Sequence, residues 1–188
     1  MLAYVFWHRP AEGVAQDVYE AAIIRFHHSL AARPPVGLVR TVCLRAAALA
    51  WLGGDDGYED WYVVEDFAAI GVLNEAAVGR RHLTAHDDAA RRAGPGTGSI
   101  YRLLEGAASP GEARVAVWVD KPRGVASPAL AGLLGDGMDA THAGLWQRQL
   151  SLGPAPEFCV LAGEPPAGVA STRLAHGWSA SAAARAPL

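Results

Sequence analysis

The residue of greatest chemical interest in this sequence is His8, which ends a short strand-like run near the N-terminus. Tyr4, Phe6 and His8 lie on one face of that run if it is extended, because side chains alternate with a period of two in a strand. An imidazole titrates near neutral pH and can act as a general base. His8 is therefore the first candidate for a catalytic residue.

A second run of the same kind gives His8 a candidate partner. Residues 116–122 repeat the order of residues 4–10: apolar or aromatic residues, then a polar residue, a basic residue and a proline. His8 and Asp120 take matching positions, and a carboxylate can orient an imidazole for general-base work. We predict His8 and Asp120 as the catalytic residues of any active site. The alternative is that both simply end their strands and face solvent.

The aromatic residues of these two runs are the predicted binding residues. They are Tyr4, Phe6, Trp7 and Trp118. A cavity walled by such rings would suit a small apolar or aromatic ligand, although large aromatic side chains in strands more often serve packing. No cofactor is predicted, with haem held by one of the histidines as a minor alternative.

The other histidines have simpler interpretations. His27 and His28 fall late in a predicted helix, where a protonated imidazole interacts favourably with the helix C-terminus and at least one of the two is exposed. His82 and His86 stand one helical turn apart, which is the spacing of two metal ligands. Leu83 occupies the place of the glutamate in the metalloprotease signature. A solvated helix face is therefore favoured, and no metal site is predicted.

A glycine-rich run at residues 94–98 is interpreted as a turn that ends a helix. A phosphate-binding loop would lead into the N-terminus of a helix. This run instead precedes a predicted strand, and no Gly-Lys-Ser/Thr follows it.

The elements that must position these residues can be placed over residues 1–106. A strand is predicted at residues 2–8 and a helix at 17–32, where Tyr19, Ile23, Phe26 and Leu30 form one apolar stripe. Residues 36–52 and 61–64 flank a turn at 53–57. Asp66 is the predicted N-cap of the next helix. A further helix over 80–93 and a closing strand over 99–104 complete the order β-α-β-β-α-β, the ferredoxin-like motif.

The second half begins the same order again. A strand opens at residues 113–122, a helix is predicted between Leu130 and Leu150, and strands are predicted at 157–162 and 171–178. Residues 113–178 are thus predicted as a degenerate second ferredoxin-like unit, and residues 179–188 as a flexible tail, because their alanines show no apolar pattern. The predicted fold class is α+β, with an internal duplication and antiparallel sheets.

This order of elements resembles the dimeric α/β-barrel superfamily, which includes small monooxygenases, haem-degrading enzymes and proteins of no known role. The resemblance implies two sheets packed face to face around a cavity, with helices outside. It leaves open whether the barrel closes within one chain or across a homodimer. The expected function is a small-molecule-binding or structural barrel of unassigned role. The alternatives are a cofactor-independent monooxygenase acting on an aromatic molecule, and a haem-binding protein.

Composition narrows the function classes further. The 188 residues are 51% hydrophobic with a formal net charge of −3, which fits a folded domain and does not fit a nucleic-acid-binding protein. Cys43 and Cys159 lie in apolar runs and are predicted to be buried thiols. No stretch is long and apolar enough for a membrane span, and no signal peptide is recognised, so a cytoplasmic protein is expected. The abundance of alanine, arginine and glycine suits a bacterial source.

Overall fold

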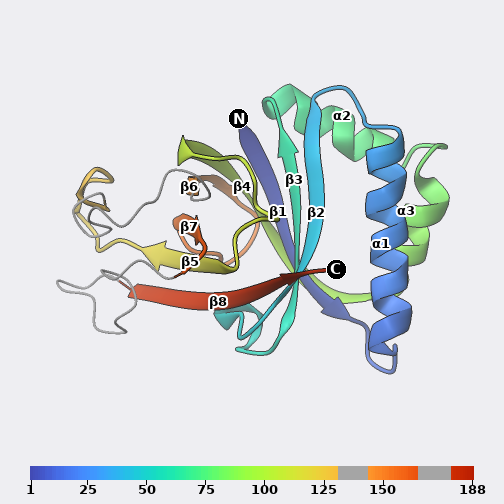
Figure 1. Ribbon diagram of the computed structural model, residues 1–188, viewed down its shortest axis with the longest axis horizontal. Coiled ribbons are helices and arrows are strands. Elements are labelled where there is room, and N and C mark those ends of the chain that lie inside the picture. Colours follow the sequence, from blue (N-terminus) through green and yellow to red (C-terminus); the bar gives the residue numbers. More distant parts are fainter. Residues whose placement is uncertain (131–143, 165–178) are drawn as a thin grey trace.

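The computed structural model describes residues 1–130, 144–164 and 179–188 (Figure 1). In the first half the elements are β1 (Leu2–Pro10), α1 (Gln16–Ala32), β2 (Leu38–Ala46), a short 3-10 turn (Ala50–Leu52), β3 (Gly57–Val64), α2 (Phe67–Ala77), α3 (Leu83–Ala90) and β4 (Ala93–Gly106). In the second half they are β5 (Val115–Asp120), β6 (Gly144–Ser151), β7 (Phe158–Ala162) and β8 (Ser179–Pro187).

The described strands form a closed antiparallel barrel in the order β1-β3-β2-β8-β5-β7-β6-β4. The barrel closes within one chain, which decides between the two alternatives left by the sequence. Helices α1, α2 and α3 lie together outside the barrel, beside β1, β2 and β3 (Figure 1). The α+β class and the barrel-like antiparallel sheet are thus confirmed. Among the described residues, no helix combines the length and apolar character needed to cross a membrane.

Local sequence signals hold best in the first half. All four residues of the apolar stripe predicted for α1 are buried. The Asp66 carboxylate accepts a hydrogen bond from the Ala69 amide at 2.9 Å and so caps α2, as expected of an N-cap residue. Cys43 and Cys159 are free and buried, as predicted.

The glycine-rich run at 94–98 is not a turn but part of β4, which corrects the prediction. The rings of the neighbouring strand β1 explain its composition. A Cβ atom on Gly98 would lie 2.8 Å from the Tyr4 ring, and one on Gly96 would lie 2.5 Å from the Phe6 ring. Glycine is required at both positions because these rings lie across the β4 backbone.

Two predictions for the second half were wrong. Residues 179–188 contain β8, which pairs with β5 and β2 and closes the barrel, whereas a flexible tail was predicted. Residues 144–150 lie in β6, whereas a helix was predicted up to Leu150; four glycines between 132 and 144 already weakened that helix. The rest of that helix and the strand predicted at 171–178 lie outside the described residues.

The inside of the barrel is packed with aromatic side chains. Trp7, Trp61, Trp118 and Trp146 are fully buried there, and the rings of Trp7 and Trp118 meet edge to face at 5.1 Å. The expected cavity between the strand faces of Tyr4 and Trp118 is therefore absent. Tyr4 lies on the outer face of β1, whereas Trp118 points into the barrel.

Candidate active site

A pocket of about 710 Å³ lies between the outer face of the first sheet and the helices. Aromatic and aliphatic side chains from β1, β3, β4, α1 and α2 form most of its wall, including Tyr4, Phe6, Phe26, Tyr62, Ile70 and Ile100. Three polar lining residues, His8, Tyr19 and Asp60, are almost completely buried. The pocket thus combines an apolar wall with a small polar group at its buried part.

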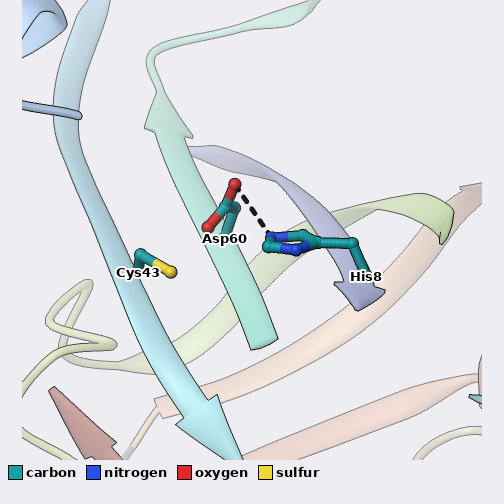
Figure 2. Close-up of side chains that lie close together, drawn as sticks. All are labelled: His8, Cys43 and Asp60. Carbon is teal, nitrogen blue, oxygen red and sulfur yellow. Dashed lines mark ion pairs between the residues drawn. The ribbon is translucent and has the colours of Figure 1, made fainter. Parts of the chain in front are cut away.

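Strand register brings the polar group together. Phe6 is the direct partner of Asp60 in the β1–β3 pairing, and His8 is the partner of Tyr58. His8 and Asp60 are therefore diagonal neighbours on one face of the sheet, close enough for their side chains to meet. Cys43 is the direct partner of Asp60 on β2. Figure 2 shows the side chains of His8, Asp60 and Cys43 gathered from these three strands.

The imidazole of His8 is held at both ring nitrogens. Its Nε2 atom lies 3.2 Å from Asp60 Oδ2, and its Nδ1 atom lies 2.6 Å from the Tyr19 hydroxyl. Burial, and then the charge of Asp60, raise the pKa of Tyr19, so the phenol keeps its proton and donates it to Nδ1. The Nε2 atom of a neutral imidazole then carries the hydrogen that faces Asp60. The result is a chain of three side chains from Tyr19 through His8 to Asp60.

Asp60 also holds a second imidazole. The Nε2 atom of His27 lies 3.1 Å from Asp60 Oδ1, and the Tyr62 hydroxyl donates to Asp60 Oδ2 at 3.0 Å. Burial by itself would raise the pKa of Asp60, but the two imidazoles outweigh it and lower the pKa well below its usual range. Asp60 is therefore a buried carboxylate that stays ionised between two histidines.

His27 was predicted to be a solvated or capping residue, and that prediction was wrong. It is buried, its ring stacks on Tyr62 with centroids 5.3 Å apart, and its Nδ1 atom lies 2.5 Å from the Thr41 hydroxyl. It follows Ile23 by four residues, which places it beside the apolar stripe of α1. His28, the next residue, is exposed as predicted for one of the pair.

The predicted pair of His8 and Asp120 does not form. Asp120 is exposed at the end of β5, where its Oδ1 atom accepts a hydrogen bond from the Glu157 amide at 2.8 Å. Aligning the two runs by their prolines matches Phe6 with Trp118, although these residues lie on opposite faces. A shift of one residue moves every side chain of a strand to the other face. Asp60 takes the place predicted for Asp120.

The predicted binding residues divide between the two faces of the sheet. Tyr4 and Phe6 line the pocket, whereas Trp7 and Trp118 are packed inside the barrel. The sequence carried one signal for the residue that was missed. In β3 the alternation of Tyr58, Asp60 and Tyr62 places a carboxylate on the same face as two aromatic rings, but the strand was predicted to begin only at Trp61.

His82 and His86 do not form the predicted solvated helix face. His82 precedes α3, is buried, and its Nδ1 atom lies 2.8 Å from the Ser29 hydroxyl. His86 is half-buried, lines the pocket, and contacts the Asp87 carboxylate at 3.2 Å. The two side chains are engaged with different partners and do not act as a pair.

One group of side chains has the composition of a metal site. Candidate ligand atoms of His8, Cys43 and Asp60 lie within 4.8 Å of one another. Burial raises the pKa of the Cys43 thiol well above its usual value, which favours the neutral form, whereas a metal ligand is a thiolate. Asp60 is already engaged by His8, His27 and Tyr62. This arrangement favours a hydrogen-bonded carboxylate, and the absence of a metal site remains a prediction.

Comparison with known proteins adds information at the level of the fold. No family model matches the chain, and no curated protein matches it in sequence. Three solved structures are similar to it. The chain shares its fold with these proteins. They are an anthrone oxidase-like protein (10% identity, 98% of this chain and 90% of that chain, TM-score 0.52), a proposed monooxygenase from Lactobacillus acidophilus (10%, 100% and 97%, 0.53), and a proposed monooxygenase from Fusobacterium nucleatum (11%, 100% and 92%, 0.58). The fold thus resembles that of α/β-barrel monooxygenases, as the order of elements predicted.

Proposed function

We propose that this protein is an enzyme that binds a flat aromatic molecule between the sheet and the helices and removes a proton from it, as the first step of an oxygenation that needs no cofactor. The observation that carries this proposal is the chain from Tyr19 through His8 to Asp60 at the buried part of an apolar pocket. The names of the three similar structures supply the reaction class, and the chemistry is argued from this chain's own residues.

The pocket suits such a ligand in size and lining. Its volume of about 710 Å³ falls within the range of small-molecule sites, roughly 300–1,000 Å³. Tyr4 stacks on Phe6 and on Tyr62, with ring centroids 6.3 and 6.0 Å apart, so the sheet presents a row of aromatic rings. A planar ring system can pack on this surface with its acidic group toward His8.

Proton removal follows the order of the hydrogen bonds. An acidic hydroxyl or activated methylene of the substrate gives its proton to the Tyr19 oxygen while Tyr19 passes its own proton to His8 Nδ1. The transfer is concerted because burial disfavours a free tyrosinate. The Asp60 carboxylate stabilises the imidazolium that forms, as the third member of a nucleophile-base-acid arrangement does.

The substrate anion can then react with dioxygen directly. Electron transfer from the delocalised carbanion to dioxygen, followed by radical combination, forms a carbon–oxygen bond. Protonation gives a hydroperoxide, and loss of water leaves a ketone. Overall, one methylene and one dioxygen become one carbonyl and one water. The substrate is the reductant and dioxygen is the oxidant, so no further redox partner is required.

Anthrone, a tricyclic ketone with an activated methylene, is a suitable probe. The conversion of anthrone to anthraquinone is followed by absorbance for the wild type, His8→Asn and His28→Asn, in buffer with a chelator. We expect kcat to fall by about 10²-fold or more in His8→Asn, with the dissociation constant of anthrone little changed. His28 is exposed on α1 and serves as the matched control. Equal turnover by the first variant, or no turnover by the wild type, would overturn the proposal.

The two remaining alternatives are separated by simple measurements. A binding or structural barrel would bind anthrone, or nothing, without turning it over. Haem would give a Soret band in the purified protein or after haem is added. We expect no such band, because both ring nitrogens of His8 and of His27 already contact protein groups.

The finer architecture is also part of the proposal. Strands β2-β3-β1-β4 are neighbours in the barrel, and β6-β7-β5-β8 repeat this order in the second half. This repetition supports a ferredoxin-like unit at residues 1–106 and a second unit from residue 113 that extends to β8. Light scattering tests the predicted homodimer, which is not required for barrel closure.

A further inference from the structure

We propose that Asp60, His27 and Thr41 form the path by which the abstracted proton leaves the pocket, with His27 as its second proton-carrying residue. This inference rests on the proposed function, because it concerns the proton that His8 receives. It goes beyond that function by assigning a role to a buried histidine that does not line the pocket.

The path is continuous in the structure. It runs from the Tyr19 hydroxyl to His8 Nδ1 (2.6 Å), from His8 Nε2 to Asp60 Oδ2 (3.2 Å), from Asp60 Oδ1 to His27 Nε2 (3.1 Å), and from His27 Nδ1 to the Thr41 hydroxyl (2.5 Å). Tyr19 lines the pocket at one end. Thr41 is partly exposed on β2 at the other end. Asp60 thus connects the pocket to the protein surface through two imidazoles.

Charge balance determines how many protons this cluster holds. Asp60 is buried and ionised, and among the described residues its ion-pair partners are His8 and His27, with no lysine or arginine. A buried charge needs a compensating charge, so one of the two imidazoles carries a proton. If both were protonated, the cluster would hold a net positive charge away from water. The two histidines therefore share one proton.

The groups around the cluster do not compete for this proton. Tyr58 and Cys43 face His8, and Tyr62 faces His27. Burial raises the pKa of all three, so they stay neutral. The arrival of a substrate proton at His8 consequently drives the shared proton off His27 toward Thr41.

Kinetics of His27→Gln test the path. The first turnover, measured by rapid mixing, is expected to stay within about twofold of the wild type, because His8 can still accept a proton. The steady-state kcat is expected to fall by about tenfold or more and to recover as a small base such as imidazole buffer is added. A purely structural defect gives no such recovery. Thr41→Val, a smaller change at the outer end, should show the same buffer dependence, and exposed His28→Gln should show none.

An NMR measurement without substrate separates failure of the path from failure of the proposed function. If the histidines share one proton, His27→Gln or Thr41→Val moves it toward His8 and changes the ring ¹⁵N shifts of His8. Unchanged His8 shifts in both variants would overturn the path even if the enzyme is active. A wild-type kcat in low buffer for His27→Gln, or a loss that buffer does not reverse, would overturn it as well. If the wild type does not oxidise anthrone, the proposed function fails while the ¹⁵N shifts still report the shared proton.

Discussion

Asp60 contacts His8 at 3.2 Å across the pairing of β1 and β3. Both residues lie inside strands of a closed barrel, so their positions are fixed by backbone hydrogen bonds on either side. A catalytic pair held on rigid elements keeps its geometry better than one held on loops. The relationship also places the chemistry outside the barrel, under the helices, where the aromatic packing of the barrel interior leaves it undisturbed.

Asp60 ties the stability of the fold to pH. Its pKa is well below the ordinary value of 3.8 in the folded protein. A carboxyl of this kind contributes stability above its unfolded pKa, and the contribution is lost as pH falls toward the folded pKa. We expect the free energy of unfolding in urea to decline below about pH 4, and Asp60→Asn to flatten this decline. The same slope in both proteins would contradict the assignment. Asp120→Asn, at an exposed carboxylate, should leave the slope unchanged.

Two glycines at the pocket should respond in opposite directions to alanine. At Gly98 the new Cβ would meet the Tyr4 ring at 2.8 Å, so Gly98→Ala should cost about 1–3 kcal/mol and weaken anthrone binding. Gly71 lies in α2 and lines the same pocket, but nothing lies within 4 Å of its Cβ position. Gly71→Ala should stabilise the fold by about 0.5–1 kcal/mol. Urea unfolding measures both, and equal effects would refute the packing described for Tyr4.

The last strand is fixed inside the barrel by a buried ion pair. Arg185 Nε lies 2.9 Å from Glu59 Oε2, both side chains are fully buried, and the guanidinium lies 5.5 Å from the centre of the Trp61 ring. Arg185→Met leaves the Glu59 charge unpaired and should cost about 3–5 kcal/mol. Adding Glu59→Gln to this variant should restore part of the loss. A double variant as unstable as the sum of the singles would show that the pair does not act as a unit.

The sequence predicted those parts of the fold that depend on local pattern. The stripe of α1, the Asp66 cap and the apolar run of β1 are each decided by side chains within a few residues of one another. The partner of His8 is decided by strand pairing, which brings Asp60 to it from another part of the chain. The end of β3 nearest Asp60 contains two acidic residues and was therefore interpreted as a turn.

The second half was harder to predict for a related reason. Strand β8 is composed mainly of alanines and gains its place by pairing with β5 and β2 and by burying Arg185. None of these contacts leaves a periodic signal in the segment itself. His27 likewise looks like a surface residue on a helix until Asp60 and Thr41 are placed beside it.

The most direct test of the account compares two carboxylates, one that the structure places beside His8 and one that the sequence placed there. Anthrone-dependent dioxygen uptake is measured at neutral pH for Asp60→Asn and Asp120→Asn, after circular dichroism confirms that both are folded. We expect the rate to fall by about 10²-fold or more in Asp60→Asn and to stay within about twofold of the wild type in Asp120→Asn. Full uptake by Asp60→Asn, or its loss in Asp120→Asn, would contradict the assignment of the site to the pocket beneath the helices.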